Sequence, residues 1–321
     1  MDIALKKSDT DTHSHNPMNH TTPRQWIIFF FLAVAWGSSY LWIKLALREI
    51  TPGRIAALRV CFAAMGLLVL LHGTRRKFPR DRATLAKLTA LAVLSIVMPF
   101  HLLIWGASQI SSVLTGILNG TVPLFTVILA HLFLPGEQMN LLKFLGLCLG
   151  MAGSVLLVAS GNPHGLAGLT HIGASSSIAG ALAILAASSC YAMGAVFARS
   201  RLQSVNPITL ATTATCIAAA LLVLIELTIN RHVTPVFPRL PLTWVALVWM
   251  GLIGSSAGYV LYFHLLAAWG ASRVSFVMYL APLVAMVLGM LFLGERPGLL
   301  LYAGTALVFC GIGVTNIRQR T

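Results

Sequence analysis

Long apolar runs separated by short polar junctions make up most of the chain from residue 26 onward. A helix needs about 20 apolar residues to cross the hydrocarbon core of a bilayer. The runs have this length, so they predict ten transmembrane helices. The predicted spans are residues 26–47, 53–72, 84–107, 112–134, 141–160, 178–199, 206–230, 242–268, 272–294 and 298–317.

Two polar stretches divide the chain into two sets of five runs. Residues 1–25 are polar and lack periodicity, which predicts a disordered cytoplasmic tail. Residues 161–177 are uncharged and rich in Gly, Ser and His, which predicts a linker on the outer side of the membrane. The predicted units are therefore residues 26–160 and residues 178–317.

The composition excludes several classes of protein. Of the 321 residues, 57% are hydrophobic and 9% are charged, whereas soluble domains are about 25% charged. The mean hydropathy is +0.85. Such a chain cannot hide its apolar surface in one water-soluble core. A disordered protein, a secreted disulfide scaffold and an ordinary cytosolic enzyme are excluded, and an all-α integral membrane protein is favoured.

The net charge of +14 reflects Lys and Arg that lie in short clusters between the apolar runs. This distribution does not resemble a nucleic-acid-binding face, so no nucleic-acid partner is expected. If the N-terminus is inside and successive spans cross in alternating directions, fifteen of the 22 basic residues fall on the inner side. The loop that contains Arg75–Arg82 contributes most to this excess. The positive-inside rule then predicts that both termini lie in the cytoplasm. The location expected for this multi-pass protein is the bacterial inner (plasma) membrane.

The two sets of runs resemble each other. Residues 123–134 (PLFTVILAHLFL) and 282–293 (PLVAMVLGMLFL) agree at six of twelve positions, at an offset of 159. An offset of 155 pairs Pro52 with Pro207 and also sets Trp36 against Tyr191 and Lys44 against Arg199. Five helices are an odd number, so the second set must cross the membrane inverted. Inverted repeats recur in secondary transporters, with the substrate path where the repeats meet.

Short motifs in a consistent order carry a resemblance to a known family. They are Trp36-Gly37-Ser38-Ser39, Lys44, Pro52, Leu58-Arg59, Asn119-Gly120-Thr121-Val122-Pro123, Phe133-Leu134, Gly136-Glu137, Tyr279-Leu280-Ala281-Pro282 and Phe292-Leu293-Gly294-Glu295. The chain resembles the EamA-type transporters of the drug/metabolite transporter superfamily, over nearly its whole length after the tail.

The resemblance implies ten helices in two inverted five-helix EamA-type repeats with cytoplasmic termini. It implies a central cavity lined mainly by the first four helices of each repeat, with the fifth of each packed behind. It also implies export of small metabolites, commonly amino acids and their derivatives.

Polar and aromatic side chains inside the spans are the candidate substrate-binding residues. Asn119 either binds substrate or bridges two helices, because an amide in hydrocarbon needs a partner. The aromatic candidates either form an amphipathic cage or pack helices together. Two histidines either donate hydrogen bonds or carry a proton, or are satisfied core residues. The aromatic residues are Trp36, Tyr40, Trp105, Tyr191, Tyr262 and Tyr279, and the histidines are His101 and His264.

Two prolines and two cations have candidate roles in movement and in attraction of substrate. Pro123 and Pro282 are expected within helices at equivalent repeat positions, as hinges or as ordinary membrane-helix kinks. Lys44 and Arg59 are expected at the cavity mouth, where they attract a carboxylate or extend to the lipid headgroups.

No nucleophile–base pair, paired carboxylates, metal-ligand spacing or phosphate-binding motif is found, so neither an enzyme nor a cofactor or metal is expected. Of the eight acids, Glu226 alone falls inside an apolar run. The sequence predicts a secondary transporter that exports small amphipathic metabolites by alternating access without ATP. Its partners are a small-molecule substrate and the bilayer, as a monomer or alternatively a dimer. The alternatives are a membrane-embedded lipid-modifying enzyme and a non-transporting membrane scaffold.

Overall fold

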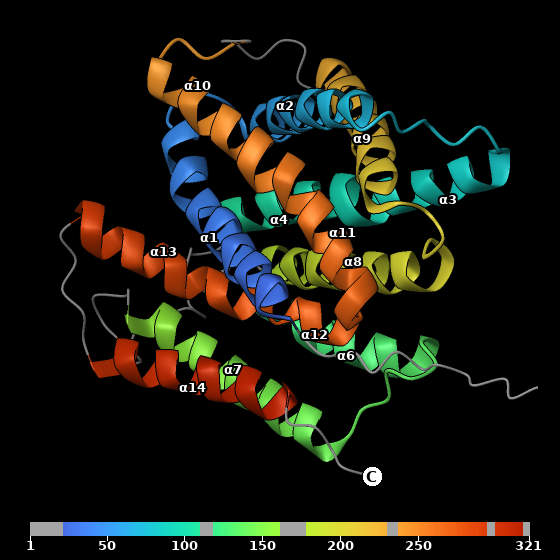
Figure 1. Cartoon of the computed structure of the whole chain (residues 1–321). Coiled ribbons are helices and arrows are strands. Elements are labelled where there is room, and N and C mark those ends of the chain that lie inside the picture. The colour runs from blue at the N-terminus through green and yellow to red at the C-terminus, as the bar shows by residue number, and fades with distance from the viewer. Residues whose placement is uncertain (1–21, 110–117, 161–177, 230–236, 294–298, 317–321) are drawn as a thin grey trace, which may run out of the picture.

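The computed structural model describes residues 22–109, 118–160, 178–229, 237–293 and 299–316. Within these ranges every regular element is a helix (Figure 1). In chain order the elements are α1 (Pro23–Ala46), α2 (Pro52–Gly73), α3 (Arg82–Ala92), η1 (Val93–Val97), α4 (Met98–Gln109), α6 (Val122–Phe133), α7 (Leu141–Ser160), α8 (Ile178–Arg201), α9 (Pro207–Ile229), α10 (Pro241–Val248), η3 (Trp249–Ala257), α11 (Gly258–Trp269), α12 (Ala271–Ser275), α13 (Val277–Leu293) and α14 (Leu299–Asn316).

The predicted spans coincide with these helices where the structure describes them. Two spans are each built of three consecutive elements with a π-helical middle, α3–η1–α4 and α10–η3–α11. Six helical runs are long and apolar enough to cross a membrane, and shorter apolar helices lie beside them. The expectation of an all-helical membrane protein is therefore confirmed for the described residues. The tail up to residue 21, the linker 161–177 and the Gly294-Glu295 pair lie outside them.

Proline marks the start of several helices. α1, α2, α9 and α10 each begin at a proline, namely Pro23, Pro52, Pro207 and Pro241. The first turn of a helix leaves its N–H groups without intrahelical partners, and proline has no N–H to leave unsatisfied. These residues fix where the spans begin, and α1 begins slightly earlier than the sequence analysis predicts.

Glycine allows α7 and α14 to pack closely along their length, at one edge of the molecule (Figure 1). A Cβ placed on Gly146 would lie 2.6 Å from the carbonyl oxygen of Gly311. On Gly153 it would lie 2.7 Å from the carbonyl oxygen of Gly304. Small residues permit such backbone approach in membranes, where packing drives helix association.

The other helices pack in pairs drawn from opposite halves of the chain. α1 packs against α13, α8 packs against both α4 and α6, and α2 packs against α9. Helices from the two halves thus enclose a common interior.

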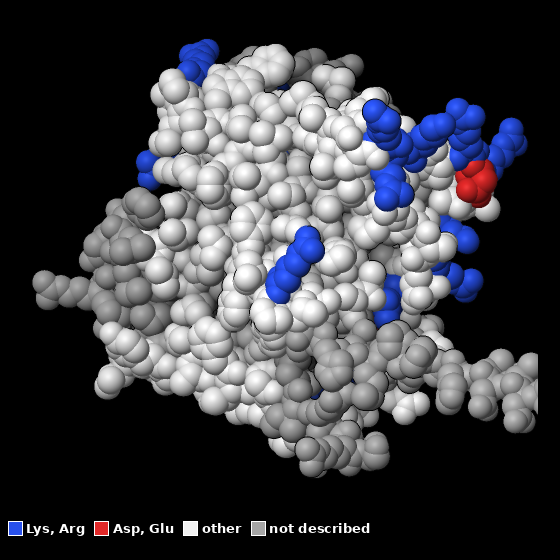
Figure 2. Space-filling model, in the orientation of Figure 1, with Lys and Arg blue, Asp and Glu red and all other residues white. Residues whose placement is uncertain are grey.

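The outer surface is apolar, as a lipid-facing surface must be. Large aliphatic side chains are exposed on several helices, among them Ile27 (69%), Val69 (74%) and Leu299 (87%). The start of α1, the end of α14 and the loop between α2 and α3 lie at the same end of the bundle (Figure 1). Figure 2 shows basic side chains gathered around that loop.

Candidate functional site

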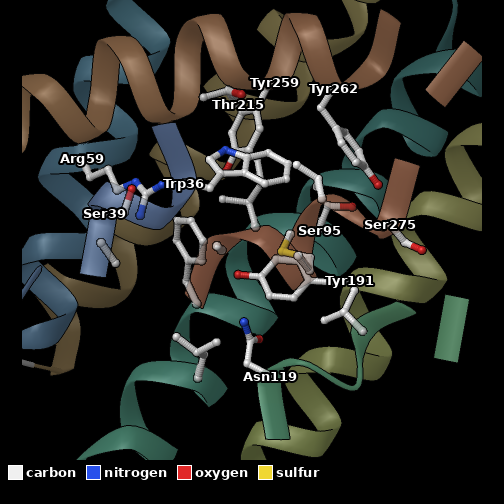
Figure 3. A pocket seen from close by; sticks show the side chains of 18 of the residues that line it. Trp36, Ser39, Arg59, Ser95, Asn119, Tyr191, Thr215, Tyr259, Tyr262 and Ser275 are labelled. Atoms are coloured by element: carbon white, nitrogen blue, oxygen red, sulfur yellow. The ribbon is translucent and has the colours of Figure 1, made fainter. Parts of the chain in front are cut away.

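A cavity of about 160 Å³ lies at the centre of the bundle (Figure 3). Both halves line it. The first contributes residues of α1, α2, α3–η1–α4 and α6 together with Asn119, and the second contributes residues of α8, α9, α11, α12 and α13. Among the described residues none from α7 or α14 lines it. A mostly apolar cavity with a few convergent polar groups is the usual form of a small-molecule site.

Aromatic side chains from both halves form much of the wall. The Trp36 indole N–H donates to the Gly254 carbonyl at 2.8 Å, which fixes the ring across the boundary between α1 and η3. The Tyr262 ring lies 5.4 Å from the Trp36 ring, centroid to centroid. Tyr191 and Tyr259 also belong to this wall (Figure 3). These surfaces suit an apolar or aromatic ligand body.

Arg59 of α2 is the charged side chain in the described part of the cavity lining. Its Nε donates to the Ser255 hydroxyl at 3.0 Å, and its guanidinium carbon lies 5.2 Å from the centroid of the Phe100 ring. These contacts, a hydrogen bond and a cation–π interaction, are what hold the head group in place. In Figure 3 the guanidinium extends toward Trp36.

Uncharged polar groups lie around the rest of the cavity. Asn119, which comes just before the turn at Gly120-Thr121 that precedes α6, is buried there. Thr215 of α9 is fully buried, and its Oγ1 has no hydrogen-bond partner among the described atoms. The Ser275 hydroxyl donates to the Ser272 carbonyl at 2.8 Å. The cavity therefore offers hydrogen-bonding groups as well as an apolar surface.

The two π-helical segments border the cavity from opposite halves. Ser95 of η1 lines it, and Ser255 of η3 holds Arg59. π-Helical turns widen a helix locally and often occur at functional sites. One π-helical segment thus lines the cavity, and the other contacts a residue that lines it.

Carboxylates from the first half bind helix starts of the second half at both ends of the bundle. Glu137, after α6, accepts backbone N–H groups of Ala271 and Ser272 at 2.9 Å each, at the start of α12. Arg199 Nε lies 3.7 Å from the same carboxylate. At the other end Glu49, after α1, accepts the Leu240 N–H at 3.0 Å, just before α10. Helix N-termini favour anions because of their free N–H groups and the helix dipole.

Five candidate residues lie together in the cavity lining, namely Trp36, Arg59, Asn119, Tyr191 and Tyr262. The remaining described candidates lie elsewhere. His101 is half-buried, with Nδ1 3.0 Å from the Val97 carbonyl oxygen. Trp105 is 50% exposed, and His264 is exposed on α11. Tyr279 is fully buried behind the cavity, and its hydroxyl donates to the Leu147 carbonyl at 3.3 Å.

The two candidate hinges differ in their position within a helix. Pro123 lies in the first turn of α6, after a turn at Gly120-Thr121, and not in a helix interior as expected. Proline fits that position because the first turn needs no N–H donor. Pro282 lies inside α13. The side chains of Tyr40, Lys44 and Pro282 lie outside what the structure describes.

The sequence analysis missed Phe100, Tyr259 and Thr215, all in the lining. A signal for two of them was present. Tyr259 precedes Tyr262 by three residues, so both lie on one helix face. Phe100 and Tyr259 also stand at the repeat offset of 159. Nothing local marks Thr215, since threonine is common in this helix.

Comparison with known proteins gives matches over nearly the whole chain. A profile of the EamA-like transporter family matches residues 24–159 and 178–317. An uncharacterized transporter of Archaeoglobus fulgidus is 25% identical over 310 residues, which cover 92% of this chain and 100% of the relative. The uncharacterized inner membrane transporter YedA of Escherichia coli is 27% identical over 261 residues, which cover 81% of this chain and 80% of the relative.

A solved crystal structure has the same fold. It is 18% identical in sequence, and the match has a TM-score of 0.77 over 91% of this chain and 96% of that chain. At this identity the likeness concerns the fold alone. The family profile spans well over half of the residues, in one match on each side of the linker. The chain therefore belongs to the EamA-like transporter family.

Proposed function

We propose that this protein is a secondary transporter that exports small amphipathic metabolites, such as amino acids or their derivatives, across the inner membrane by alternating access without ATP. The observation that carries the proposal is the central cavity, which both halves line with aromatic, amide, hydroxyl and guanidinium groups. The substrate would bind there and be released to either side as the halves move relative to each other.

The cavity lining supports ten helices arranged as two five-helix repeats related by inversion. Many lining residues form pairs at the repeat offsets. At 155 the pairs are Trp36/Tyr191 and Arg59/Ala214, and at 159 they are Phe100/Tyr259, Leu103/Tyr262, Ile104/Phe263, Asn119/Met278 and Val122/Ala281. Corresponding positions that face one interior are the expected result of a pseudo-two-fold axis through the cavity.

The helix contacts support the same symmetry. The packing of α1 on α13 corresponds to the packing of α8 on α6, with the halves exchanged. The packing of α2 on η3 corresponds in the same way to that of α9 on α3 and η1. Two further contacts join helices that correspond to each other in the two halves, α2 with α9 and α7 with α14. A two-fold axis would exchange the two helices of each such pair.

The carboxylates at the two ends provide contacts that alternating access would break in turn. Glu137 joins the halves at one end and Glu49 joins them at the other. Opening the cavity toward one side requires that the contact at that end separate, while the other contact keeps the opposite end closed. Each contact consists of a few hydrogen bonds, so its loss is compatible with thermal movement.

The alternatives receive less support from the cavity. A lipid-modifying enzyme would need an activated nucleophile or a metal, and no Asp, Glu, His or Cys is in the described lining. A scaffold has no need for a cavity that both halves line.

An export assay tests the proposal. Cells with and without the protein are loaded with radiolabelled amino acids and derivatives, and efflux and resistance to toxic analogues are measured. Asn119→Leu removes a polar group of the cavity at similar volume, while Leu132→Ala changes a lipid-facing residue that is 65% exposed. We expect faster efflux of at least one compound with the parent and the Leu132 variant, and a loss with the Asn119 variant at equal protein level. Equal efflux with and without the protein across the panel would contradict the proposal.

A further inference from the structure

The charge of the cavity is positive and lacks a matching anion. Arg59 is the charged group in the described lining. Its Nε is bound to Ser255, and its Nη atoms make no hydrogen bond within the described part of the chain. Two carboxylates outside the described lining are already engaged, Glu226 by Arg54 at 3.4 Å and Glu137 by Arg199 and the start of α12.

Comparison of the two halves shows that the fold does not need a cation at this place. The position that corresponds to Arg59 at the offset of 155 is Ala214, which also lines the cavity. The position that corresponds to Asn119 at 159 is Met278. Corresponding positions of the two halves thus both line the cavity but carry different side chains. The first half supplies the guanidinium and the amide, and the second half has a methyl and a thioether group at the corresponding positions.

An uncompensated guanidinium inside a membrane protein is costly, and such residues commonly mark substrate paths. Its planar Nη pair matches a carboxylate with two parallel hydrogen bonds. A monoanion would neutralise the lining, whereas a zwitterion would leave its net charge unchanged and bring an ammonium group for which the described lining offers no carboxylate.

We propose that the cavity binds an amphipathic monocarboxylate with its carboxylate on Arg59 and its apolar body against the aromatic wall of Trp36, Tyr191 and Tyr262. The carboxylate form of a given carbon skeleton then binds more tightly than the corresponding α-amino acid or amide. This inference rests on the proposed function, because it names the substrate class of the same cavity.

Binding to the purified full-length protein in nanodiscs tests this order of affinity. The affinities of two matched sets of probes are measured by calorimetry. The first set is 3-phenylpropionate, phenylalanine and 3-phenylpropionamide. The second set is 4-methylpentanoate, leucine and 4-methylpentanamide. We expect at least one carboxylate to bind about tenfold more tightly than both relatives of its set. The amide lacks the charge-assisted hydrogen bond to Arg59, and the amino acid must bury an ammonium group for which the described lining offers no anion. Arg59→Gln abolishes this preference, Arg59→Lys keeps part of it, and Arg76→Gln, an exposed loop variant, leaves it unchanged.

The outcomes separate this inference from the proposed function. Three results would overturn the inference. The amino acids or amides bind as tightly as the carboxylates or more tightly, neither carboxylate binds, or the preference survives Arg59→Gln in a protein that elutes as a monodisperse species. Flux of the same probes is then measured in proteoliposomes. Carboxylate binding that depends on Arg59 without flux supports the inference and counts against transport. Flux of amino acids that is unaffected by Arg59→Gln supports transport and overturns the inference.

Discussion

A buried ion pair joins two helices that are far apart in the sequence and pack together in the structure. Arg54 Nε of α2 lies 3.4 Å from Glu226 Oε1 of α9, with 7% and 11% of the two side chains exposed. The Thr51 hydroxyl donates to the same oxygen at 3.4 Å. Because both side chains are mostly buried, each charge needs the other for compensation: an unpaired ion in a poorly solvated place strongly destabilises the folded protein.

We expect Glu226→Gln to lower stability markedly, because it leaves the Arg54 guanidinium buried without its anion. The expected loss is about 3 kcal/mol, seen as a lower thermal midpoint of the purified protein. The double variant Arg54→Gln/Glu226→Gln should recover part of this loss, since it removes the unpaired charge. A midpoint for Glu226→Gln equal to that of the parent would show that the pair contributes nothing.

At the scale of elements, proline has different effects according to its place in a helix. Pro123 is in the first turn of α6, where the missing N–H costs nothing. Pro282 is inside α13 and there frees the carbonyl four residues earlier, that of Met278, which lines the cavity. Only the second position weakens a helix at the depth of the cavity.

We therefore expect the two proline variants to behave differently. Pro123→Ala should change stability by less than about 1 kcal/mol and leave transport near the parental rate. Pro282→Ala restores a backbone hydrogen bond in α13, so it should keep or raise the thermal midpoint while slowing transport. Efflux rates and midpoints of both variants check this. A loss of transport with Pro123→Ala as large as with Pro282→Ala would contradict it.

The N-terminal cap of α3 should be sensitive to pH. Asp81 accepts the Thr84 backbone N–H at 2.7 Å, and this hydrogen bond lowers the pKa of the Asp81 carboxyl below its ordinary value. With a folded pKa below the unfolded value of about 4, the cap stabilises α3 above that value and is lost as the pH falls through the folded pKa.

Amide hydrogen exchange in the first turn of α3 tests this cap. At neutral pH, Asp81→Ala should exchange faster than the parent, and Asp81→Asn should remain close to it because asparagine also caps. As the pH falls through the folded pKa, protection in the parent should approach that of the alanine variant, after correction for the intrinsic rate. Protection that follows the same course in the parent and in the Asn variant would contradict a role for ionised Asp81.

At the scale of the whole molecule, the ends of the bundle differ in charge. The start of α7, the end of α8 and α12 lie at the same end as the basic loop between α2 and α3, together with the start of α1 and the end of α14 (Figure 1). These three segments carry Lys143, Arg199 and Arg273. From the positive-inside rule we therefore predict that this end faces the cytoplasm.

Cysteine labelling tests this orientation. In a background without the native cysteines, Arg76→Cys and Arg239→Cys place one exposed thiol at each end. A membrane-impermeant maleimide added to intact cells should label position 239 and should reach position 76 only after the cells are permeabilised. The reverse pattern would mean that the protein has the opposite orientation.

Much of the fold was predictable from sequence, but only part of the site was. Runs of apolar residues located the helices because hydrophobicity along the chain is a local property. Prolines at the helix starts were a further local signal that the sequence analysis did not use. Trp36, Asn119 and Arg59 were found because each is unusual in its setting. Tyr279 was chosen for the same reason, yet the structure packs it against Leu147 and Gly150, away from the cavity.

The sequence by itself determined that the chain is a membrane protein built of helices and roughly where the described helices lie, and it predicted that its halves repeat. Only the tertiary structure decided which face of each helix meets the cavity and which distant charges pair, as Glu226 does with Arg54 and Glu137 with the start of α12. The physical reason is that a helix in lipid is apolar on every side, so no contrast between polar and apolar faces marks the inner one. Inward faces and partners are fixed only when the helices pack.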